Sequence, residues 1–202
     1  MPAKRPRPLP RATAVGERDG FKLRGGRPAL DLPATLAGRR RAEPRELLRT
    51  PADLGRWLVA AGLAARPPAV TAAHLAQARE LREALYRLAL ACVRRRPLAA
   101  GDRALLNRWA AEPPPAPQLG RGGVSWIGAG VPALLAAVAR DGVELFGGPL
   151  APRIRGCAGT GCALLFLDTS RAGARRWCSM AGCGNRAKVK GFRRRLQSAG
   201  GR

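Results

Sequence analysis

Four cysteines near the C-terminal end are the residues whose type and spacing most clearly predict chemistry. They form two C-x4-C pairs separated by fifteen residues, and the four are Cys157, Cys162, Cys178 and Cys183. Zinc prefers four ligands in a tetrahedron, and four thiolates meet that preference without leaving an open position for a substrate. The spacing therefore predicts a structural zinc site, with an iron–sulfur cluster and a pair of disulfides as the alternatives.

A strongly basic segment surrounds and follows these cysteines. The chain has a formal charge of +24, and residues 151–202 carry twelve Lys and Arg side chains against one acid, Asp168. An Arg-rich composition can also reflect genomic base composition, so the uneven distribution matters more than the total. A concentration of this kind favours a polyanionic partner. The predicted nucleic-acid contacts are Arg171, Arg175, Arg176, Arg186, Lys188, Lys190, Arg193 and Arg194.

The residues between and after the cysteine pairs predict the elements that hold the metal. The apolar run 163–167 has the length of a strand, and 168–173 has the composition of a turn. Residues 174–177 are expected to return antiparallel to the first strand. After Cys183, the residues Val189, Phe192 and Leu196 recur at helical spacing, which predicts a basic helix whose apolar seam docks on this hairpin. Together these elements predict a small treble-clef-like zinc finger with four cysteine ligands.

The upstream part of the chain predicts one mainly helical domain. Thr50 and Pro51 have the residue types of a helix start, and a long apolar stripe begins after Thr71 with Glu80 and Glu83 placed to pair with Arg87. Further helices are expected over about 102–111 and from residue 132 to 146, with strands near 21–24 and a hairpin around 119–127. The predicted fold class is therefore mainly α (α+β). Its domains are a disordered basic arm over 1–20, a helical domain over 21–150 and a zinc finger over 151–198.

The sequence offers few features of an enzyme. No phosphate-binding glycine loop, HExxH or GxSxG motif occurs, and the predicted zinc site has no free coordination position. His74, the one histidine, reads as an ordinary helix residue, and Cys92 reads as a small core residue. There is no run of eighteen apolar residues and no apolar segment after the charged N-terminus, so neither a membrane span nor a secretory signal is predicted.

The tetrapeptide Cys183-Gly-Asn-Arg186, with the upstream Arg175-Arg-Trp-Cys-Ser-Met180, resembles the CGNR zinc finger family. The segments 26–31, 50–63 and 78–85 are similar to the ABATE domain that precedes this finger in family members. The resemblance implies that the four cysteines bind zinc, that the finger binds DNA, and that the chain is a stress-induced transcription regulator.

These observations favour a cytoplasmic, nucleoid-associated DNA-binding regulator that is not an enzyme. Its helical domain would sense a small-molecule or protein effector, or mediate homodimerisation. RNA binding, with Trp177 as the stacking residue, is one alternative. A protein-interaction module, in which the zinc finger is only a fold, is the other.

Overall fold

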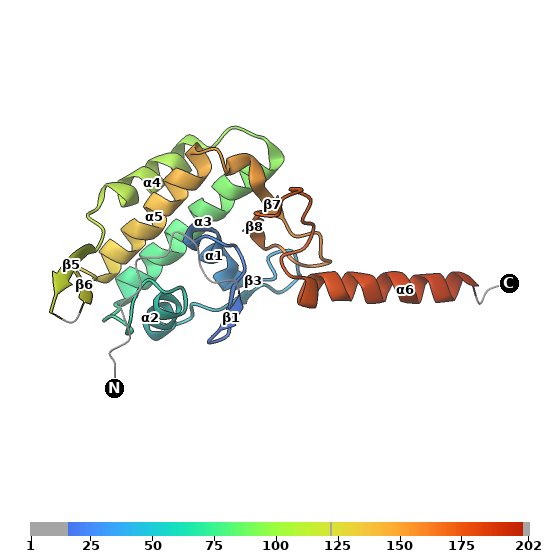
Figure 1. Ribbon diagram of the computed structural model, residues 1–202, viewed down its shortest axis with the longest axis horizontal. Coiled ribbons are helices and arrows are strands. Elements are labelled where there is room, and N and C mark those ends of the chain that lie inside the picture. The colour runs from blue at the N-terminus through green and yellow to red at the C-terminus, as the bar shows by residue number, and fades with distance from the viewer. Residues whose placement is uncertain (1–15, 122, 200–202) are drawn as a thin grey trace.

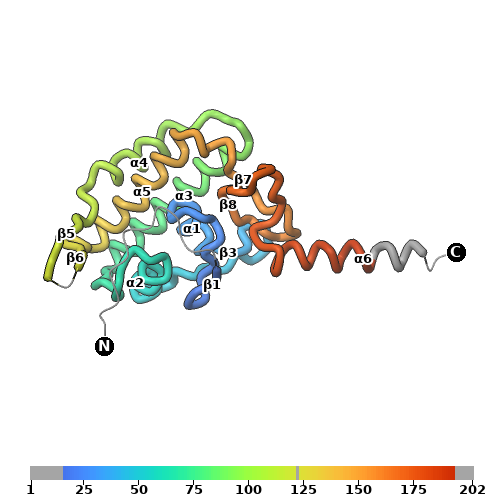
Figure 2. The backbone as a smooth tube through the Cα atoms, viewed as in Figure 1, coloured from blue at the N-terminus to red at the C-terminus, as the bar shows by residue number. Residues whose placement is uncertain are grey.

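The computed structural model describes residues 16–121 and 123–199, with side chains described as far as residue 193. Five helices and three hairpins precede the cysteine-rich segment, and a final helix follows it (Figure 1). Among the described residues the fold is mainly helical with short strands, as the sequence predicted. Figure 2 shows the path of the chain through these elements.

Helices form the body of the N-terminal region. They are α1 (Pro28–Asp31), α2 (Pro51–Ala60), α3 (Ala72–Arg94), α4 (Ala100–Ala111) and α5 (Val131–Gly147). In Figure 1, α3, α4 and α5 pack side by side, while α1 and α2 cover one side of α3. Their buried faces are rich in Leu and Ala, with Trp57 the largest fully buried side chain. The apolar stripes in the sequence are therefore the contacts that form this core.

Every strand of the described chain belongs to a two-stranded antiparallel pair. These are β1 (Gly16–Arg18) with β2 (Phe21–Leu23), β3 (Leu36–Ala37) with β4 (Arg45–Glu46), β5 (Ala116–Gly120) with β6 (Gly123–Ile127), and β7 (Ile154–Gly156) with β8 (Leu165–Leu167). The β5–β6 hairpin was predicted. The β1 strand is a correction, because it occupies the end of the arm expected to be disordered; residues 1–15 of that arm lie outside the described residues.

Two of the helices begin with a reciprocal capping box. In α2 the Thr50 hydroxyl accepts a hydrogen bond from the Asp53 amide, while the Asp53 carboxylate accepts one from the Thr50 amide. Thr71 and His74 make the same exchange at the start of α3. This satisfies amides that the first turn leaves without partners. His74 is thus an ordinary helix residue in this structure.

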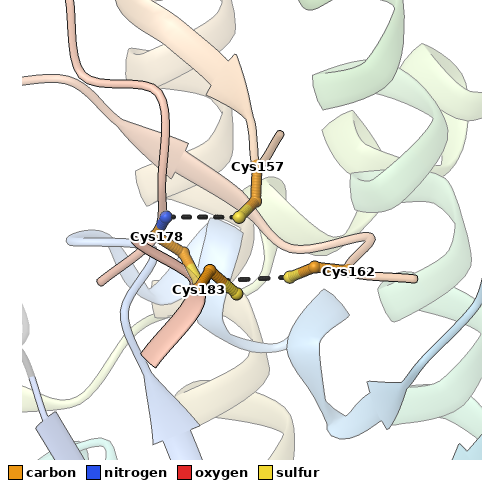
Figure 3. A group of neighbouring side chains, drawn as sticks. All are labelled: Cys157, Cys162, Cys178 and Cys183. Carbon is orange, nitrogen blue, oxygen red and sulfur yellow. Dashed lines mark hydrogen bonds between the residues drawn. The ribbon is translucent and has the colours of Figure 1, made fainter. Parts of the chain in front are cut away.

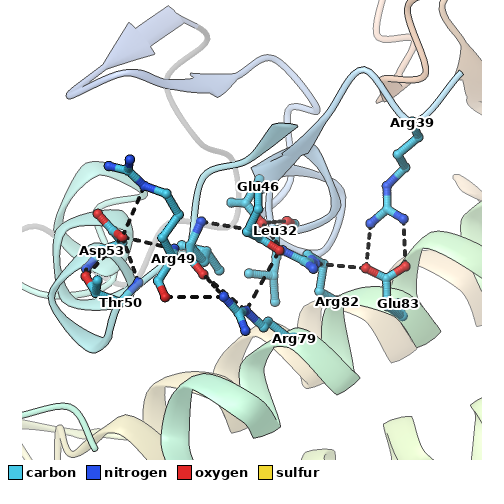
Figure 4. Close-up of polar contacts among 11 residues, drawn as sticks. Leu32, Arg39, Glu46, Arg49, Thr50, Asp53, Arg79, Arg82 and Glu83 are labelled. Carbon is cyan, nitrogen blue, oxygen red and sulfur yellow. Dashed lines mark hydrogen bonds and ion pairs between the residues drawn. The ribbon is translucent and has the colours of Figure 1, made fainter. Parts of the chain in front are cut away.

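Ion pairs inside the helical region differ from the predicted pairing along α3. Glu83 bonds Arg39 at 2.6 Å and Arg82 at 2.9 Å, as Figure 4 shows, whereas Arg87 pairs with Asp102 of α4 at 2.6 Å. The predicted pairing of Arg87 with Glu80 or Glu83 is therefore wrong. Glu80 lies seven residues before Arg87, beyond the three- or four-residue spacing of helical neighbours, and tertiary packing brings Asp102 to Arg87 and Arg39 to Glu83.

The β7–β8 hairpin joins the cysteine-rich segment to the helical region. Ile154, Leu165 and Leu167 are buried in the same apolar core as the helices. The Leu167 amide also donates a 2.8 Å hydrogen bond to the Gly25 carbonyl in the loop before α1. The two parts of the chain thus share a core and a backbone hydrogen bond.

Candidate metal centre and basic helix

Asp168 organises the turn between the two cysteine pairs. Its side chain is fully buried, and its carboxylate accepts hydrogen bonds from the Ser170 amide, the Ser170 hydroxyl and the Arg175 amide at 2.6–2.9 Å. Burial acts to raise the pKa of Asp168, but the hydrogen bonds from Ser170 and Arg175 outweigh it and lower that pKa. The predicted turn is present, and its only acid is committed to holding the turn together.

The strand expected over 174–177 does not form. Leu165–Leu167 pairs instead with β7, which precedes the first cysteine, and bonds Gly25 on its other side. Residues 174–177 follow the cysteine loop, where the Arg176 carbonyl accepts a 2.9 Å hydrogen bond from the Ala158 amide. The prediction failed because both edges of β8 are already taken, one by β7 on the other side of the first cysteine loop and one by the loop at Gly25.

The four predicted metal ligands come together in space. Their sulfur atoms all lie within 4.8 Å of one another, although the two pairs are fifteen residues apart in the chain (Figure 3). The Cys178 sulfur lies 3.7 Å from that of Cys183 and 4.0 Å from that of Cys162. Cys157, Cys178 and Cys183 are buried, and Cys162 is half-buried. Each pair contributes its two sulfurs to a single cluster.

These distances fit a tetrahedral zinc ion. Four sulfurs about 2.3 Å from a central zinc are about 3.8 Å apart from one another, close to the separations seen here. The cluster holds thiols and no other metal-binding group, which suits a closed structural site. Its cofactor is structural zinc. In the cluster without metal, the hydrogen bond between Cys178 and Cys162 lowers the pKa of Cys162 and raises the pKa of Cys178, so metal binding must displace thiol protons.

Backbone amides and a glycine complete the surroundings of the cluster. The amides of Gly159 and Cys178 donate hydrogen bonds to the Cys157 sulfur at 3.4 and 3.3 Å. A methyl group on Gly159 would lie 2.9 Å from the Cys183 sulfur, closer than real contacts allow. Gly159 is therefore needed for space at the metal centre.

The predicted nucleic-acid contacts before the last cysteine pair have different surroundings. Arg171 is exposed. Arg175 lies over the Phe166 ring at 4.5 Å and donates to the carbonyls of Trp177 and Cys178, so it supports the cysteine loop. Arg176 is exposed and lies over the half-buried Trp177 ring at 5.1 Å.

Helix α6 (Asn185–Ala199) carries the remaining predicted contacts. It follows a single π-helical turn (Met180–Gly184) that contains Cys183, and it projects away from the body of the molecule (Figure 1). Arg186, Lys188, Lys190 and Arg193 are exposed. Arg186 also donates a 3.1 Å hydrogen bond to the Cys183 sulfur, which ties the helix to the cluster. The side chain of Arg194 lies outside the described part of the chain.

The predicted docking of this helix on a hairpin is wrong. Val189 and Phe192 remain 46% and 54% exposed, because α6 extends into solvent and leaves the cluster after its first turn. The helical periodicity correctly predicted α6. It did not predict which element packs on the apolar side of α6, because periodicity contains no information about the packing partner.

One positioning element was not identified from the sequence. The Gly25 amide donates a 2.7 Å hydrogen bond to the Asp31 carboxylate, and the Gly25 carbonyl then receives the Leu167 amide. In the same loop, Arg27 pairs with Asp141 of α5 at 2.6 Å. The loop therefore bonds both β8 and α5. The sequence feature that could have identified this loop is Asp31 a few residues after Gly25 and Gly26.

None of the helices in the described chain combines the length and apolar content needed to cross a membrane.

Comparison with family models finds two consecutive matches that together cover most of the chain. Residues 26–149 match the ABATE family, described as "Putative stress-induced transcription regulator", and residues 153–196 match the CGNR zinc finger. Neither is an enzyme family. A search of curated proteins found no match. The family matches agree with the architecture that the sequence predicted.

Proposed function

Since the chain belongs to the ABATE family and carries a CGNR zinc finger behind that domain, we propose that it is a transcriptional regulator that binds duplex DNA through α6. In this proposal Cys157, Cys162, Cys178 and Cys183 hold a zinc ion that has no catalytic part. The zinc fixes the start of α6, because Cys183 lies in the turn that leads into the helix. The metal then acts through the helix that it orients.

The observation that carries the proposal is a projecting helix with exposed, unneutralised cations. Among the described side chains of α6, Arg186, Lys188, Lys190 and Arg193 form no ion pair with an acid. An α-helix fits the major groove of B-DNA, where Arg and Lys can bond both phosphates and guanine edges. Arg171 and Arg176 are exposed in the segment between the cysteine pairs and would add phosphate contacts.

The decisive test is DNA binding by zinc-loaded protein in which Lys188, Lys190 and Arg193 are all changed to Gln. Arg186 is left in place because it bonds a cysteine sulfur. If four to six phosphates are neutralised, log K of the native protein falls with log salt at a slope of about −4 to −5. The triple variant is expected to lower the steepness of that slope by about 3 units while retaining its zinc.

A matched control removes the same charge elsewhere. Arg66, Arg103 and Arg108 are exposed cations of the N-terminal region, and their change to Gln should leave DNA affinity close to that of the native protein. Equal loss in both triple variants would show that net charge, and not α6, governs binding. An unchanged slope in the α6 variant would refute the proposal. Selection of genomic fragments at near-physiological salt would then give the target sequence.

Single-stranded RNA is the second candidate, and one observation favours it. Phe192 is 54% exposed on the basic helix, and an exposed ring beside cations can stack on an unpaired base. Trp177, the stacking residue expected from the sequence, is half-buried against the cysteine cluster. In a competition assay, tighter binding of single-stranded RNA than of duplex DNA, lost on Phe192→Ala, would favour this candidate.

A further inference from the structure

A cleft of about 710 Å³ lies between the N-terminal region and the metal centre. One wall comes from residues 33–38 and the loop over 41–45, and the other from residues 160–165 and the start of the α6 segment. Cys162, Cys178 and Cys183 are part of this second wall. The cleft is thus bounded by both family-matched regions, and the metal ligands lie along its side.

The charge of the cleft is predominantly positive. Five cations line it, Lys22, Arg24, Arg41, Arg45 and Arg186, against two carboxylates. One of the two, Glu17, is 3.8 Å from Arg24, and the other is Glu43. Within the described part of the chain, Lys22, Arg41 and Arg45 make no ion pair, which contrasts with the paired arginines of α3. These three cations are available to a bound anion.

Two of the cleft arginines contact the loops that present the cysteines. A methyl group on Gly161, next to Cys162, would lie 3.4 Å from Nε of Arg41. One on Gly182, next to Cys183, would lie 3.1 Å from a terminal nitrogen of Arg24. Each cysteine pair therefore has one arginine of the N-terminal region against it. A ligand that draws these guanidinium groups toward itself would also act on the loops that hold the metal.

We propose that this cleft binds a small organic anion carrying two or more phosphate or carboxylate groups. Its volume lies within the range of about 300–1,000 Å³ typical of small-molecule sites, whereas a DNA duplex needs a much wider surface. Guanidinium groups bond phosphate and carboxylate oxygens in pairs, so Arg41 and Arg45 suit both ligand types. The cleft and the exposed face of α6 are adjacent surfaces, and Arg186 lines both of them. Lys190 and Arg193 line only the α6 surface.

The position of the cleft also predicts regulation, and this part rests on the proposed DNA-binding function. Arg186 lines the cleft, belongs to α6 and bonds the Cys183 sulfur. An anion bound there competes for Arg186 and adds negative charge at the root of the helix that is proposed to contact phosphates. Anion binding should therefore weaken DNA binding, and DNA should weaken anion binding by the same factor.

Calorimetric titration of the zinc-loaded full chain with fructose 1,6-bisphosphate, and separately with citrate, tests the site. At least one probe is expected to bind saturably at one site per chain. The Arg41→Gln/Arg45→Gln variant should bind it about tenfold more weakly, because it loses charge-assisted hydrogen bonds. Fructose bisphosphate binding alone would identify a phosphate site, and citrate binding alone a carboxylate site. Metal content measured after each titration shows that the zinc has been retained.

Control variants separate this site from the α6 surface. Binding of the probe should be unchanged in Arg66→Gln/Arg103→Gln, which removes equal charge away from the cleft, and in Lys188→Gln/Lys190→Gln/Arg193→Gln. Absence of saturable binding for both probes, or equal affinity in the cleft variant and the native protein, would overturn the proposal. So would a loss of probe binding in the α6 variant comparable to that in the cleft variant. If a probe binds the cleft but the protein does not bind DNA, the proposed DNA-binding function is refuted and the anion site is not.

Discussion

The cations of the N-terminal region and those of α6 differ in what surrounds them. Arg27, Arg39, Arg82 and Arg87 each lie within 3 Å of a carboxylate oxygen that fixes the side chain. The finger region contains one acid, Asp168, and its carboxylate bonds Ser170 and Arg175. Arginines are abundant in both regions, so their number does not distinguish arginines that stabilise the fold from arginines that are available to a partner. For the four paired arginines the carboxylate fixes the side chain, whereas the α6 cations have no such partner among the described residues and can meet an external anion.

The two regions also differ in how they are held together. The main core contains the buried faces of all five N-terminal helices and the β7–β8 hairpin. The core around the metal centre consists of Phe166 and three buried cysteines, with a few half-buried residues around them. So small a cluster buries too little apolar surface to fold on its own, and zinc coordination supplies the missing stability.

Loss of a metal ligand is expected to have the largest effect and to separate the two regions. In Cys178→Ser the site loses one of four thiolates, and zinc binding worth on the order of 10–16 kcal/mol in finger peptides is strongly reduced. Residues 157–164 and 168–193 should become protease-sensitive while the N-terminal helices, with the β7–β8 hairpin packed on them, remain folded. Metal content and limited proteolysis measure both effects. Cys92→Ser, in a half-buried thiol away from the cluster, should retain full zinc. Simultaneous unfolding of both regions would contradict the distinction between their cores.

Removal of a paired cation tests the contrast in charge. Arg82 is 4% exposed and bonds Glu46 at 2.7 Å and Glu83 at 2.9 Å (Figure 4). Arg82→Met removes two charge-assisted hydrogen bonds and should lower the free energy of unfolding by about 2–3 kcal/mol, because Arg39 and Arg79 still pair with the two carboxylates. Lys188→Met, the same charge change on α6, should alter it by less than about 0.5 kcal/mol. If chemical denaturation gives similar losses of unfolding free energy for the two variants, paired and unpaired cations do not differ in their contribution to stability.

Filling the space beside the metal should have an intermediate effect. Gly159→Ala places a methyl group 2.9 Å from the Cys183 sulfur, and overpacking of this kind costs about 1–3 kcal/mol. The expected result is a lower zinc affinity in competition with a chelator. Gly101→Ala in α4, where a methyl group meets nothing within 4 Å, provides the control and should leave zinc affinity unchanged. Unchanged affinity in Gly159→Ala would mean that the cysteine loops yield more easily than this close contact indicates.

The smallest effect concerns the cap of α2 and depends on pH. Burial acts to raise the pKa of Asp53, but hydrogen bonds from Arg56, Thr50 and Arg49 lower it to about 2. A depressed pKa stabilises the folded state above the ordinary value near 3.8 and loses that contribution as pH falls through 2. Asp53→Asn should therefore cost about 1 kcal/mol at neutral pH, and the difference should shrink between about pH 4 and 2. A difference that stays constant over that range in denaturant titrations would contradict this assignment.

Local signals in the sequence were sufficient for the helices and the ligands. Thr50 and Thr71 are capping residues, and helical periodicity follows each of them, so α2 and α3 were predicted with their starts. Four cysteines in two close pairs needed no tertiary information, since a tetrahedral metal accepts few arrangements of two C-x4-C loops. The helix starts depend on residues that are neighbours in the chain, and the preference of zinc for four thiolates links the two local cysteine pairs.

The failed predictions each concern a contact between two different segments of the chain. The partner of β8 lies before Cys157, the partner of Arg87 lies on α4, and the support for Leu167 lies in the loop at Gly25. All three depend on which of several possible segments tertiary packing brings together, and residue type and periodicity do not decide between them. The cleft is a further case, because its charge comes from residues about 140 positions apart in sequence, Arg41 or Arg45 and Arg186. A single sequence contains no local sign of such pairings.

The shared hairpin makes the boundary between the two family-matched regions a poor place to cut or to join. A finger expressed alone from residue 153 would leave Ile154, Leu165 and Leu167 without the helices that bury them. The finger is therefore not a self-contained module, and a graft onto another protein would need the surface of α3 as well. For the same reason, the direction of α6 is set by the whole molecule. Under the proposed DNA-binding function, two copies on neighbouring sites would need a separation set by the bulk of their helical bodies.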